Sequence, residues 1–586
     1  MSNIFHVPNL TNKPSRNGFD LSHKNSFTAK IGELLPILHR TLMPGDKVRL
    51  KIQHRTVTLP LQTSAFTRFT EYFDFFFVPY SQLYRNANEV LAQTQNNPIY
   101  ATSPNSASVV GTQLPWFNSH DVTGNHPLHG TGSYFQFLAG SPGAGTHTNF
   151  QGFSLACEAL KLWNYLGASY VSEAWLTKPV DTLIPAAHPY SVFPWAAYQK
   201  IYFDFYRFDQ WENNSPQCYN FDYLTGNLQF TNSMMRQQDS QSNLFTLRHC
   251  NYPKDLFFGV LPDSQRGEVS IANVHAYDYH PTYVPGSRLN KDDMYVEGND
   301  ESSSDTLLPV GILGDSEQNP GSGALSKVDL GIDIIELRTK KALQRYKEVV
   351  GTGNQDFRSM VKKIYGEDIP KHYSTDCQYL GGFSNIINVS TVVNNNLDSP
   401  TAQPGMKGIG VGNDTQNGEI KFEADTFGII MCIYRVMPLL DYALIAPHFD
   451  IVKTEVDDYA NPFFDRLGLQ ELPKMFLSDY DLDEPSEPFI GYVPRYFDYK
   501  TSVDVINGAF RTNLKSWIAV LDEDYIESFL TPGVNKDFFK VNTHLVDDIF
   551  FIASTESVNS DQFAINCNIE FKAVRNLDYD GLPKGN

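Results

Sequence analysis

Hydrophobic and polar residues alternate most regularly near the end of the chain. Five apolar residues alternate with four polar ones there: Ile565, Cys567, Ile569, Phe571 and Ala573 against Asn566, Asn568, Glu570 and Lys572. A period of two is that of a β-strand, whose successive side chains point to opposite faces of a sheet. The same alternation begins at Lys47, where Val48, Leu50 and Ile52 oppose Arg49, Lys51 and Gln53. Both segments are therefore predicted to be strands with one buried and one wet face.

Other segments predict the rest of the framework. Residues 71–80 form an aromatic run that predicts a more completely buried strand, and residues 427–436 predict another strand. Helical spacing appears at 154–165, at 195–207 (entered through Pro194) and at 332–350. Strands at both ends of the chain, with helices and long excursions between them, predict a mainly β fold. We expect a single jelly-roll β-sandwich with long inserted loops and a few helices.

Three polar tracts interrupt this framework. Residues 1–30 have neither a helical nor a strand period, so residues 1–46 are interpreted as a basic N-terminal arm that faces the interior of an assembly. Residues 96–152 are rich in Asn, Gly, Ser, Thr, His and Pro and are predicted to be a long loop insertion. Residues 268–328 are predicted to be an acidic surface insertion. We expect one domain, 1–586, to carry all three.

The net charge of −20 on 586 residues argues at first against binding to nucleic acid. The distribution of charge along the sequence is more informative. Residues 1–60 carry nine Lys/Arg and three acids, a net charge of +6, so the net charge of the remaining residues is −26. Residues 291–317 and 450–487 are strongly acidic. A basic N-terminal segment on an otherwise acidic chain indicates a subunit with two faces that contact different partners. An ordinary solvated surface with uneven charge is the alternative interpretation.

The sequence offers little sign of a membrane segment or of secretion. The N-terminus lacks the regions of a signal peptide, and the longest apolar run, about 427–434, is much shorter than a membrane span of roughly 18 residues. The six cysteines are scattered, which predicts reduced, mostly buried thiols in a protein made in a reducing cytoplasm. We expect no membrane insertion.

Motifs for catalysis and for cofactor binding are missing or incomplete. Gly408, Gly410 and Gly412 fail the dinucleotide spacing because Asn413 stands where the third glycine belongs. His126 and His129 are interpreted as loop histidines, with a metal pair as the alternative. The run 479–484 resembles the start of a calcium loop but lacks its glycine and its final glutamate, so a solvated acidic loop is favoured over a cation site. No catalytic residue, cofactor or metal is predicted.

Several ordered segments carry a family resemblance. They are Arg16-Asn-Gly-Phe-Asp-Leu-Ser22, Phe27-Thr-Ala-Lys-Ile-Gly-Glu-Leu-Leu-Pro36, Met43-Pro-Gly-Asp46, Tyr72-Phe-Asp-Phe-Phe-Phe-Val-Pro-Tyr80, Ala197-Tyr-Gln-Lys-Ile-Tyr202, Tyr206-Arg207, Leu247-Arg248, Lys254-Asp-Leu-Phe-Phe258, Leu261-Pro262, Gln265-Arg-Gly267, Glu336-Leu-Arg338, Leu343-Gln-Arg345, Tyr379-Leu-Gly-Gly382, Gly491-Tyr492, Arg495-Tyr496 and Gly508-Ala-Phe-Arg511. In this order they resemble the major capsid proteins of microviruses, particularly the gokushovirus-like and Bacteroidetes-associated branches. Asp263-Ser264 departs from the family, in which aromatic residues or proline often stand there.

The resemblance implies a structural protein without catalytic activity. Sixty copies would form a T=1 icosahedral shell around the circular single-stranded DNA of a bacteriophage, assembled in the host bacterial cytoplasm. It also implies a small basic packaging protein as a partner, with a pilot or minor capsid protein and a bacterial surface receptor as further partners. In gokushovirus-like relatives an insertion builds projections at the threefold axes, so we expect residues 268–328 to lie near such an axis and to take part in host attachment.

Two sets of candidate residues follow from charge and from this resemblance. The candidate DNA-binding residues are Arg16, Lys24, Lys30, Arg40, Lys47 and Arg49. The candidate host-facing residues are Asp292, Asp293, Glu297, Asp300, Glu301 and Asp305. A secreted β-rich adhesin or glycan-binding protein is the alternative function, but it would need a signal peptide. A rolling-circle nickase is a further alternative, for which the required His-hydrophobic-His pair is missing from the sequence.

Overall fold

The computed structural model describes residues 15–59, 61, 66–94, 113–123, 134–139, 150–171, 187–225, 227–268, 270, 275–279, 295–297, 307–309, 327–331, 334–370, 375–393, 406–413, 418–441, 446–478, 489–521, 523–530, 533–547, 549–550 and 561–580. The chain divides into two compact units, Met1–Pro262 with Asn354–Asn586, and Asp263–Gly353. The first is called the sheet unit below, and the second is called the inserted unit.

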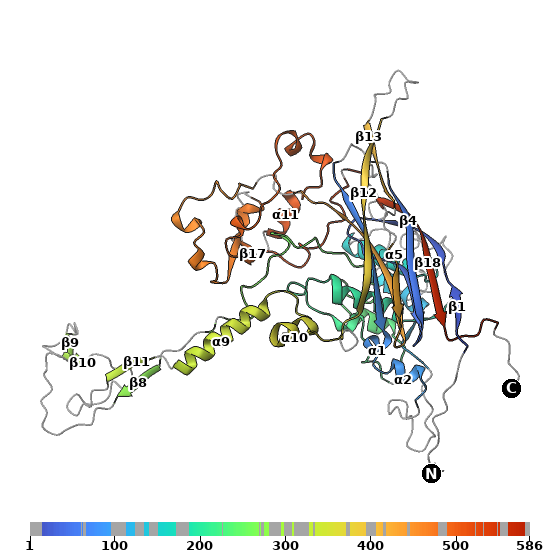
Figure 1. The fold of residues 1–586 in the computed structure, drawn as a ribbon, viewed down its shortest axis with the longest axis horizontal. Helices are drawn as coiled ribbons and strands as arrows, with labels where there is room; N and C mark the ends of the chain where they lie inside the picture. The colour runs from blue at the N-terminus through green and yellow to red at the C-terminus, as the bar shows by residue number, and fades with distance from the viewer. Residues whose placement is uncertain are drawn as a thin grey trace, which may run out of the picture. The chain divides into compact units, whose positions relative to one another are not determined.

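The sheet unit is built on one large antiparallel sheet, whose long strands lie side by side in Figure 1. Along the main path the order is β1-β18-β4-β13-β12-β5-β15-β3, while β2 also pairs with β18 and β14 with β4. The strands are β1 (Asn17–Asp20), β2 (His23–Ala29), β3 (Leu35–Leu42), β4 (Lys47–Thr58), β5 (Phe69–Pro79), β12 (Gln378–Val393), β13 (Met406–Asn413), β14 (Ile420–Glu423), β15 (Gly428–Pro438) and β18 (Phe563–Arg575). The curled sheet packs against itself as a jelly-roll sandwich, so the predicted mainly β fold is confirmed.

The two alternating segments form adjacent central strands. Along β18 the odd-numbered residues from 563 to 573 are buried and the even-numbered ones are wet, and β4 buries Val48, Leu50 and Ile52. In register, Phe571 lies opposite Leu50 and Ile569 opposite Ile52, so both buried rows enter the same core. The strands predicted at 47 onward and at 565–573 are confirmed, and the first and last strands of the chain share one sheet.

Strand β5 is buried on both faces, which explains its unbroken aromatic run. Phe73 and Phe75 face the interior of the sandwich, where Phe73 packs on Tyr434 with ring centroids 4.9 Å apart. On the opposite face, Phe76 packs on Phe205 with centroids 5.0 Å apart, and Asp74 accepts a hydrogen bond from the hydroxyl of Tyr206 at 2.8 Å. A strand enclosed on both sides needs apolar residues at successive positions.

Helices and short strands of the sheet unit surround this sheet. The helices are α1 (Tyr80–Leu83), α2 (Ala87–Leu91), α3 (Ser119–Thr123), α4 (Tyr134–Ala139), α5 (Phe150–Tyr165), α7 (Phe193–Ile201), the π-helix η2 (Tyr202–Tyr206), α8 (Asn232–Gln237), α10 (Phe357–Tyr365) and α11 (Glu523–Leu530). Short 3-10 turns cover Pro216–Cys218, Val456–Asp458, Pro462–Phe464, Lys474–Phe476, Phe497–Tyr499, Gly508–Arg511 and Lys515–Trp517. Two further strand pairs are β6 (Trp116–Asn118) with β7 (Pro189–Ser191) and β16 (Leu469–Pro473) with β17 (Phe489–Pro494).

A buried carboxylate ties four strands together inside the sandwich. Glu71 on β5 is fully buried, and it accepts hydrogen bonds from His54 Nε2 (2.8 Å) and Thr56 Oγ1 (2.6 Å) on β4. Asn385 Nδ2 on β12 donates at 2.9 Å and the Tyr434 hydroxyl on β15 at 3.1 Å. Four donors on one carboxylate satisfy a charge that would otherwise be costly to bury.

The glycine run 408–412 lies in β13, close to the hydrogen-bonded carboxylate of Glu71. A Cβ on Gly410 would come within 2.5 Å of Thr58 Cγ2, and a Cβ on Gly412 within 2.8 Å of Glu71 Oε1. These glycines permit close approach of a strand to its neighbours. The run therefore belongs to a paired β-strand.

The inserted unit contains one long helix and two small strand pairs. Helix α9 (Ile334–Gly351) confirms the helix predicted at 332–350, with a start two residues later. Strand β8 (His275–Tyr279) pairs with β11 (Lys327–Gly331), and β9 (Tyr295–Glu297) with β10 (Leu307–Pro309). Of the acidic insertion expected at 268–328, the structure describes these short strands and residues 268 and 270.

Two tracts interpreted as irregular contain regular structure. The segment 1–46, interpreted as an arm, contains β1, β2 and β3. Strands β1 and β2 both pair with β18, a partner some 550 residues away that no local period reveals. The long loop predicted at 96–152 contains β6, α3, α4 and the start of α5. The helices predicted at 154–165 and 195–207 are confirmed as α5 and as α7 continued by η2, and β15 confirms the strand at 427–436.

Candidate nucleic-acid interface

The wet face of the sheet around β4 and β18 concentrates basic side chains. Because the register places Arg49 beside Lys572 on one side and beside Lys421 of β14 on the other, three cations form a row across three strands. The basic residues on this face, called the basic face below, are Lys24, Lys47, Arg49, Lys51, Arg55, Lys421 and Lys572. A row of cations across strands can follow a phosphate backbone.

Acidic neighbours neutralise part of this charge. Lys47 lies 2.8 Å from Glu423, with both side chains 52% exposed, and Arg49 is paired with Glu419. Lys421 also lies 3.7 Å from Glu419. Ion pairs this exposed contribute about 0–1 kcal/mol each, so a phosphate can replace the carboxylate at small cost. With Asp20 and Glu570 as the other acids beside the row, the basic face keeps a positive balance.

A shallow hollow of about 660 Å³ opens at one corner of the basic face. Its lining combines apolar residues such as Phe422 and Val574 with the cations Lys47, Arg49, Lys421 and Lys572 and the carboxylates Asp20 and Glu423. Apolar surface beside cations is what a nucleotide needs, because its base is flat and largely apolar and its phosphate is anionic.

The structure brings together three of the six predicted DNA-binding residues. Lys24, Lys47 and Arg49 lie on the basic face. Arg16 is exposed just before β1 and donates to the carbonyl oxygen of Gly45 at 3.0 Å. Arg40 is exposed on β3, in the other half of the sheet, and Lys30 is 7% exposed. Since a buried ammonium cannot reach a phosphate, Lys30 is a poor member of the predicted set.

Lys421 and Lys572 escaped the prediction because they lie outside the basic first sixty residues. The alternation that reveals β18 places Lys572 on a wet face, but only the strand register puts it beside Arg49. Of the predicted host-facing residues, Glu297 ends β9, opposite Leu307 of β10. Asp292, Asp293, Asp300, Glu301 and Asp305 lie outside the described residues, as do His126, His129 and the run 479–484.

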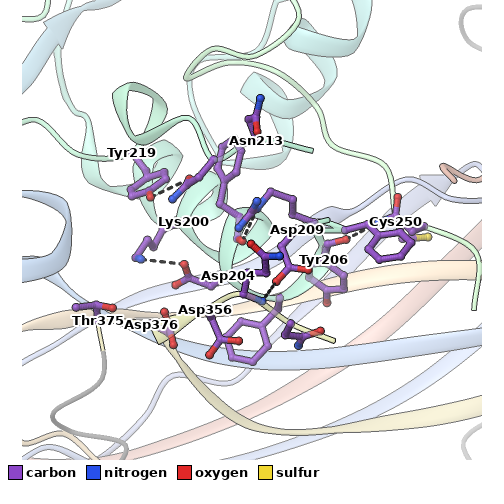
Figure 2. A pocket seen from close by; sticks show the side chains of 18 of the residues that line it. Lys200, Asp204, Tyr206, Asp209, Asn213, Tyr219, Cys250, Asp356, Thr375 and Asp376 are labelled. Carbon is purple, nitrogen blue, oxygen red and sulfur yellow. Dashed lines mark hydrogen bonds and ion pairs between the residues drawn. The ribbon is translucent and has the colours of Figure 1, made fainter. Parts of the chain in front are cut away.

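A hollow of about 1060 Å³ in the sheet unit lies around the π-helix η2 (Figure 2). Lys200 and Asp204 point toward one another in it, with Nζ and Oδ1 2.9 Å apart. On its floor Arg435 pairs with Asp74 at 3.3 Å and lies over the ring of Tyr72. These charges therefore already have partners within the chain.

The same hollow is lined by a cysteine, Cys250, whose thiolate would be a nucleophile. Burial raises the pKa of the Cys250 thiol, so little thiolate forms near neutral pH. All six cysteines of the chain are free and buried, which confirms the predicted buried thiols. Among the described residues, no group of three His, Cys, Asp or Glu side chains is placed to hold a metal ion, and no helix is long and apolar enough to cross a membrane.

A family model described as a capsid protein, the F protein of phages, matches residues 8–121 and 178–583. The chain belongs to this phage capsid protein family. The matched residues run through the whole inserted unit and omit 122–177, which contain α4 and α5. No curated protein matches the chain.

Membership in this family confirms that the chain is a phage capsid protein, as the sequence resemblance implied. This capsid protein is a structural protein of a bacteriophage of the Microviridae, a family whose coat subunits assemble as homo-oligomeric shells in the virion. It is of a non-enzymatic kind, and its buried, paired charges agree with that role.

Proposed function

We propose that sixty copies of this capsid protein form a T=1 icosahedral shell around circular single-stranded DNA, and that the basic face binds the genome. The observation that carries the second part is the row of Lys572, Arg49 and Lys421 across three strands. The gokushovirus-like branch is part of the same proposal and rests on the sequence resemblance alone.

The charge of the subunit supports a second partner. A net charge of −20 per copy opposes the packing of phosphates, and the seven cations of the basic face are too few to offset a genome. A small basic packaging protein would supply the missing positive charge. Assembly in the host cytoplasm, a pilot or minor capsid protein and a bacterial receptor belong to the same proposal.

Replacing the row of cations tests the DNA-binding role. We expect the triple variant Arg49→Gln, Lys421→Gln and Lys572→Gln to assemble but to retain less DNA, because counterion release at three phosphates is lost. For a single-stranded oligonucleotide, the slope of log K against log salt should fall by about 2, at roughly 0.7 for each lost contact. The measurements are fluorescence anisotropy on the subunit and the absorbance ratio of purified particles.

A matched control removes equal charge from α9 of the inserted unit. Arg338, Lys341 and Arg345 are exposed there, and their change to Gln also lowers the net charge by three. We expect that variant to keep the wild-type salt slope. Equal loss of DNA in both variants would mean that total charge matters and the basic face does not.

Host attachment is proposed for the acidic part of the inserted unit. Eight acids against one lysine between 291 and 317 make this segment unsuited to a phosphate-lined interior. We therefore expect it on the outside of the shell, and the resemblance to gokushovirus-like relatives implies a place near a threefold axis. Deleting 291–318 should leave particle yield near normal and reduce adsorption to the host, measured as free infectious particles after mixing. Normal adsorption of intact mutant particles would refute the attachment role.

A further inference from the structure

One segment of the sheet unit exposes every residue along its whole length. From Thr454 to Gly468 all fifteen residues are exposed, although the stretch contains five large apolar side chains. Val456 is 87% exposed, Phe463 91% and Leu467 64%, and Tyr459 and Phe464 are also exposed. Figure 1 draws it as the orange stretch with short helical turns beside β17. Such a patch marks an interaction surface.

Local bonds give this segment a defined shape. The Asp458 carboxylate accepts the backbone N–H groups of Thr454 and Glu455, both at 2.8 Å, which fixes the 3-10 turn Val456–Asp458. Asn461 caps the turn Pro462–Phe464 by accepting the N–H of Phe463 at 3.1 Å. Asp465 is paired with Lys500. A segment ordered before it binds loses less conformational entropy on docking.

Helix α10 is a second surface that lacks a cover in the described residues. It is capped at both ends, because the side chain of Asp356 accepts the N–H of Ser359 at 3.0 Å and Gly366 closes the C-terminus at φ +76°. None of its nine residues is buried. Phe357, Ile364 and Tyr365 are 53%, 45% and 74% exposed. A helix this short is marginal without tertiary packing.

The helix is amphipathic, and its charge is opposite to that of the exposed segment. At 100° per residue, Phe357, Met360, Val361, Ile364 and Tyr365 share one side of α10. Arg358, Lys362 and Lys363 flank this apolar side. Lys362 also lies 3.1 Å from Asp368, an exposed ion pair that another carboxylate can replace at small cost. The exposed segment 454–468 offers Glu455, Asp457 and Asp458 next to Val456, so apolar groups and charges match together.

We propose that segment 454–468 of one copy packs on the apolar side of α10 in a neighbouring copy. Both surfaces are exposed at the same time in one chain, so each is available to a second chain. Each copy then donates one surface and receives the other, a head-to-tail contact that closes into rings when the rotation is right. This contact, which rests on the proposed shell, would join neighbouring subunits through these two surfaces.

Cysteine cross-linking tests the pairing directly. Because the native cysteines are all buried, cysteines introduced by Phe463→Cys and Ile364→Cys are the reactive thiols. Copies with only Phe463→Cys are co-assembled with copies that carry only Ile364→Cys, and the particles are treated with a short bismaleimide. We expect a covalent dimer on a denaturing gel. Ser240→Cys, at an exposed serine, replaces Phe463→Cys in the control mixture and should give no dimer.

Charge reversal tests the same contact without new thiols. We expect Asp457→Lys and Lys362→Glu each to lower particle yield about tenfold through like-charge repulsion, and the double variant to recover most of the yield. Yield is measured by sedimentation and electron microscopy. Recovery in the double variant distinguishes a specific contact from damage to folding.

Three results would overturn the pairing while leaving the shell intact. The first is assembled particles in which both introduced thiols still react with a monofunctional maleimide. The second is protection of both thiols without a mixed dimer, which would mean that another partner or the inserted unit covers them. The third is an equal yield of covalent dimer in the control mixture with Ser240→Cys. Failure of the wild-type chain to form particles would instead refute the proposed function.

Discussion

The buried carboxylate of Glu71 offers the sharpest test of how the sandwich is held together. We expect Glu71→Gln to lower the free energy of unfolding by about 3–5 kcal/mol, the usual effect of breaking a buried charge pair by removing one partner. The structure gives the reason. Each carboxylate oxygen accepts two donors, from His54 and Asn385 at one oxygen and from Thr56 and Tyr434 at the other. An amide carries no charge and replaces one of these oxygens with an NH2 group, to which two of the four partners can no longer donate.

The pH dependence follows from the pKa of the same group. Burial raises the pKa of Glu71, but the hydrogen bond and charge of His54 and the Thr56 and Asn385 donors outweigh it, so the net shift is downward. A carboxyl with a lowered folded pKa adds stability that is present above its unfolded pKa of about 4.3 and is lost as pH falls toward the folded value. Glu71→Gln should therefore be less sensitive to pH between about 5 and 3 than wild type.

Urea denaturation of the purified subunit, followed by tryptophan fluorescence, measures the effect. The matched control is Glu423→Gln, which removes a carboxylate whose partner Lys47 is half exposed and should cost about 0–1 kcal/mol. A Glu71→Gln subunit as stable as this control would refute the reasoning, because the cluster would then contribute no more than a surface pair.

Two further predictions concern packing and thiols. Gly412→Ala places a Cβ 2.8 Å from Oε1 of the Glu71 carboxylate, which accepts four hydrogen bonds through its two oxygens, so we expect a loss of about 1–3 kcal/mol in urea denaturation; an unchanged midpoint would show that β13 can move aside. The six buried cysteines should resist a thiol reagent such as dithionitrobenzoate in the native subunit and react together when urea unfolds it; rapid reaction of any native thiol would contradict its burial.

The sequence predicted those elements whose burial is visible along a single strand or helix. Alternation reveals β4 and β18 because one face is apolar and the other charged, and α9 shows a helical period. Strands β1 and β2 escaped because polar residues such as Lys24 and Ser26 alternate with residues that are only half buried, and their partner β18 lies at the far end of the chain.

The candidate interface was predictable only in part. The sequence shows which segments are rich in basic residues, but it does not show which basic residues of different strands lie side by side in the sheet. Lys47 and Arg49 were found from the basic first sixty residues, whereas the row with Lys421 and Lys572 depends on strand register. Lys30 belongs to the same basic stretch yet is buried at the end of β2. The apolar residues of segment 454–468 look like core residues in the sequence, and only the structure shows that they are exposed.

The pairing of the first strands with the last has a consequence for synthesis in the infected cell. Strand β4 ends at Thr58 and its partner β18 begins at Phe563, so a ribosome must add about 500 residues between them, which takes roughly half a minute to two minutes at 5–20 residues per second. Throughout that time β4 presents an unpaired edge, which invites pairing with other nascent chains. Closure of the sheet therefore waits until β18 has been synthesised, and only chains that contain β18 can present a complete sheet for assembly.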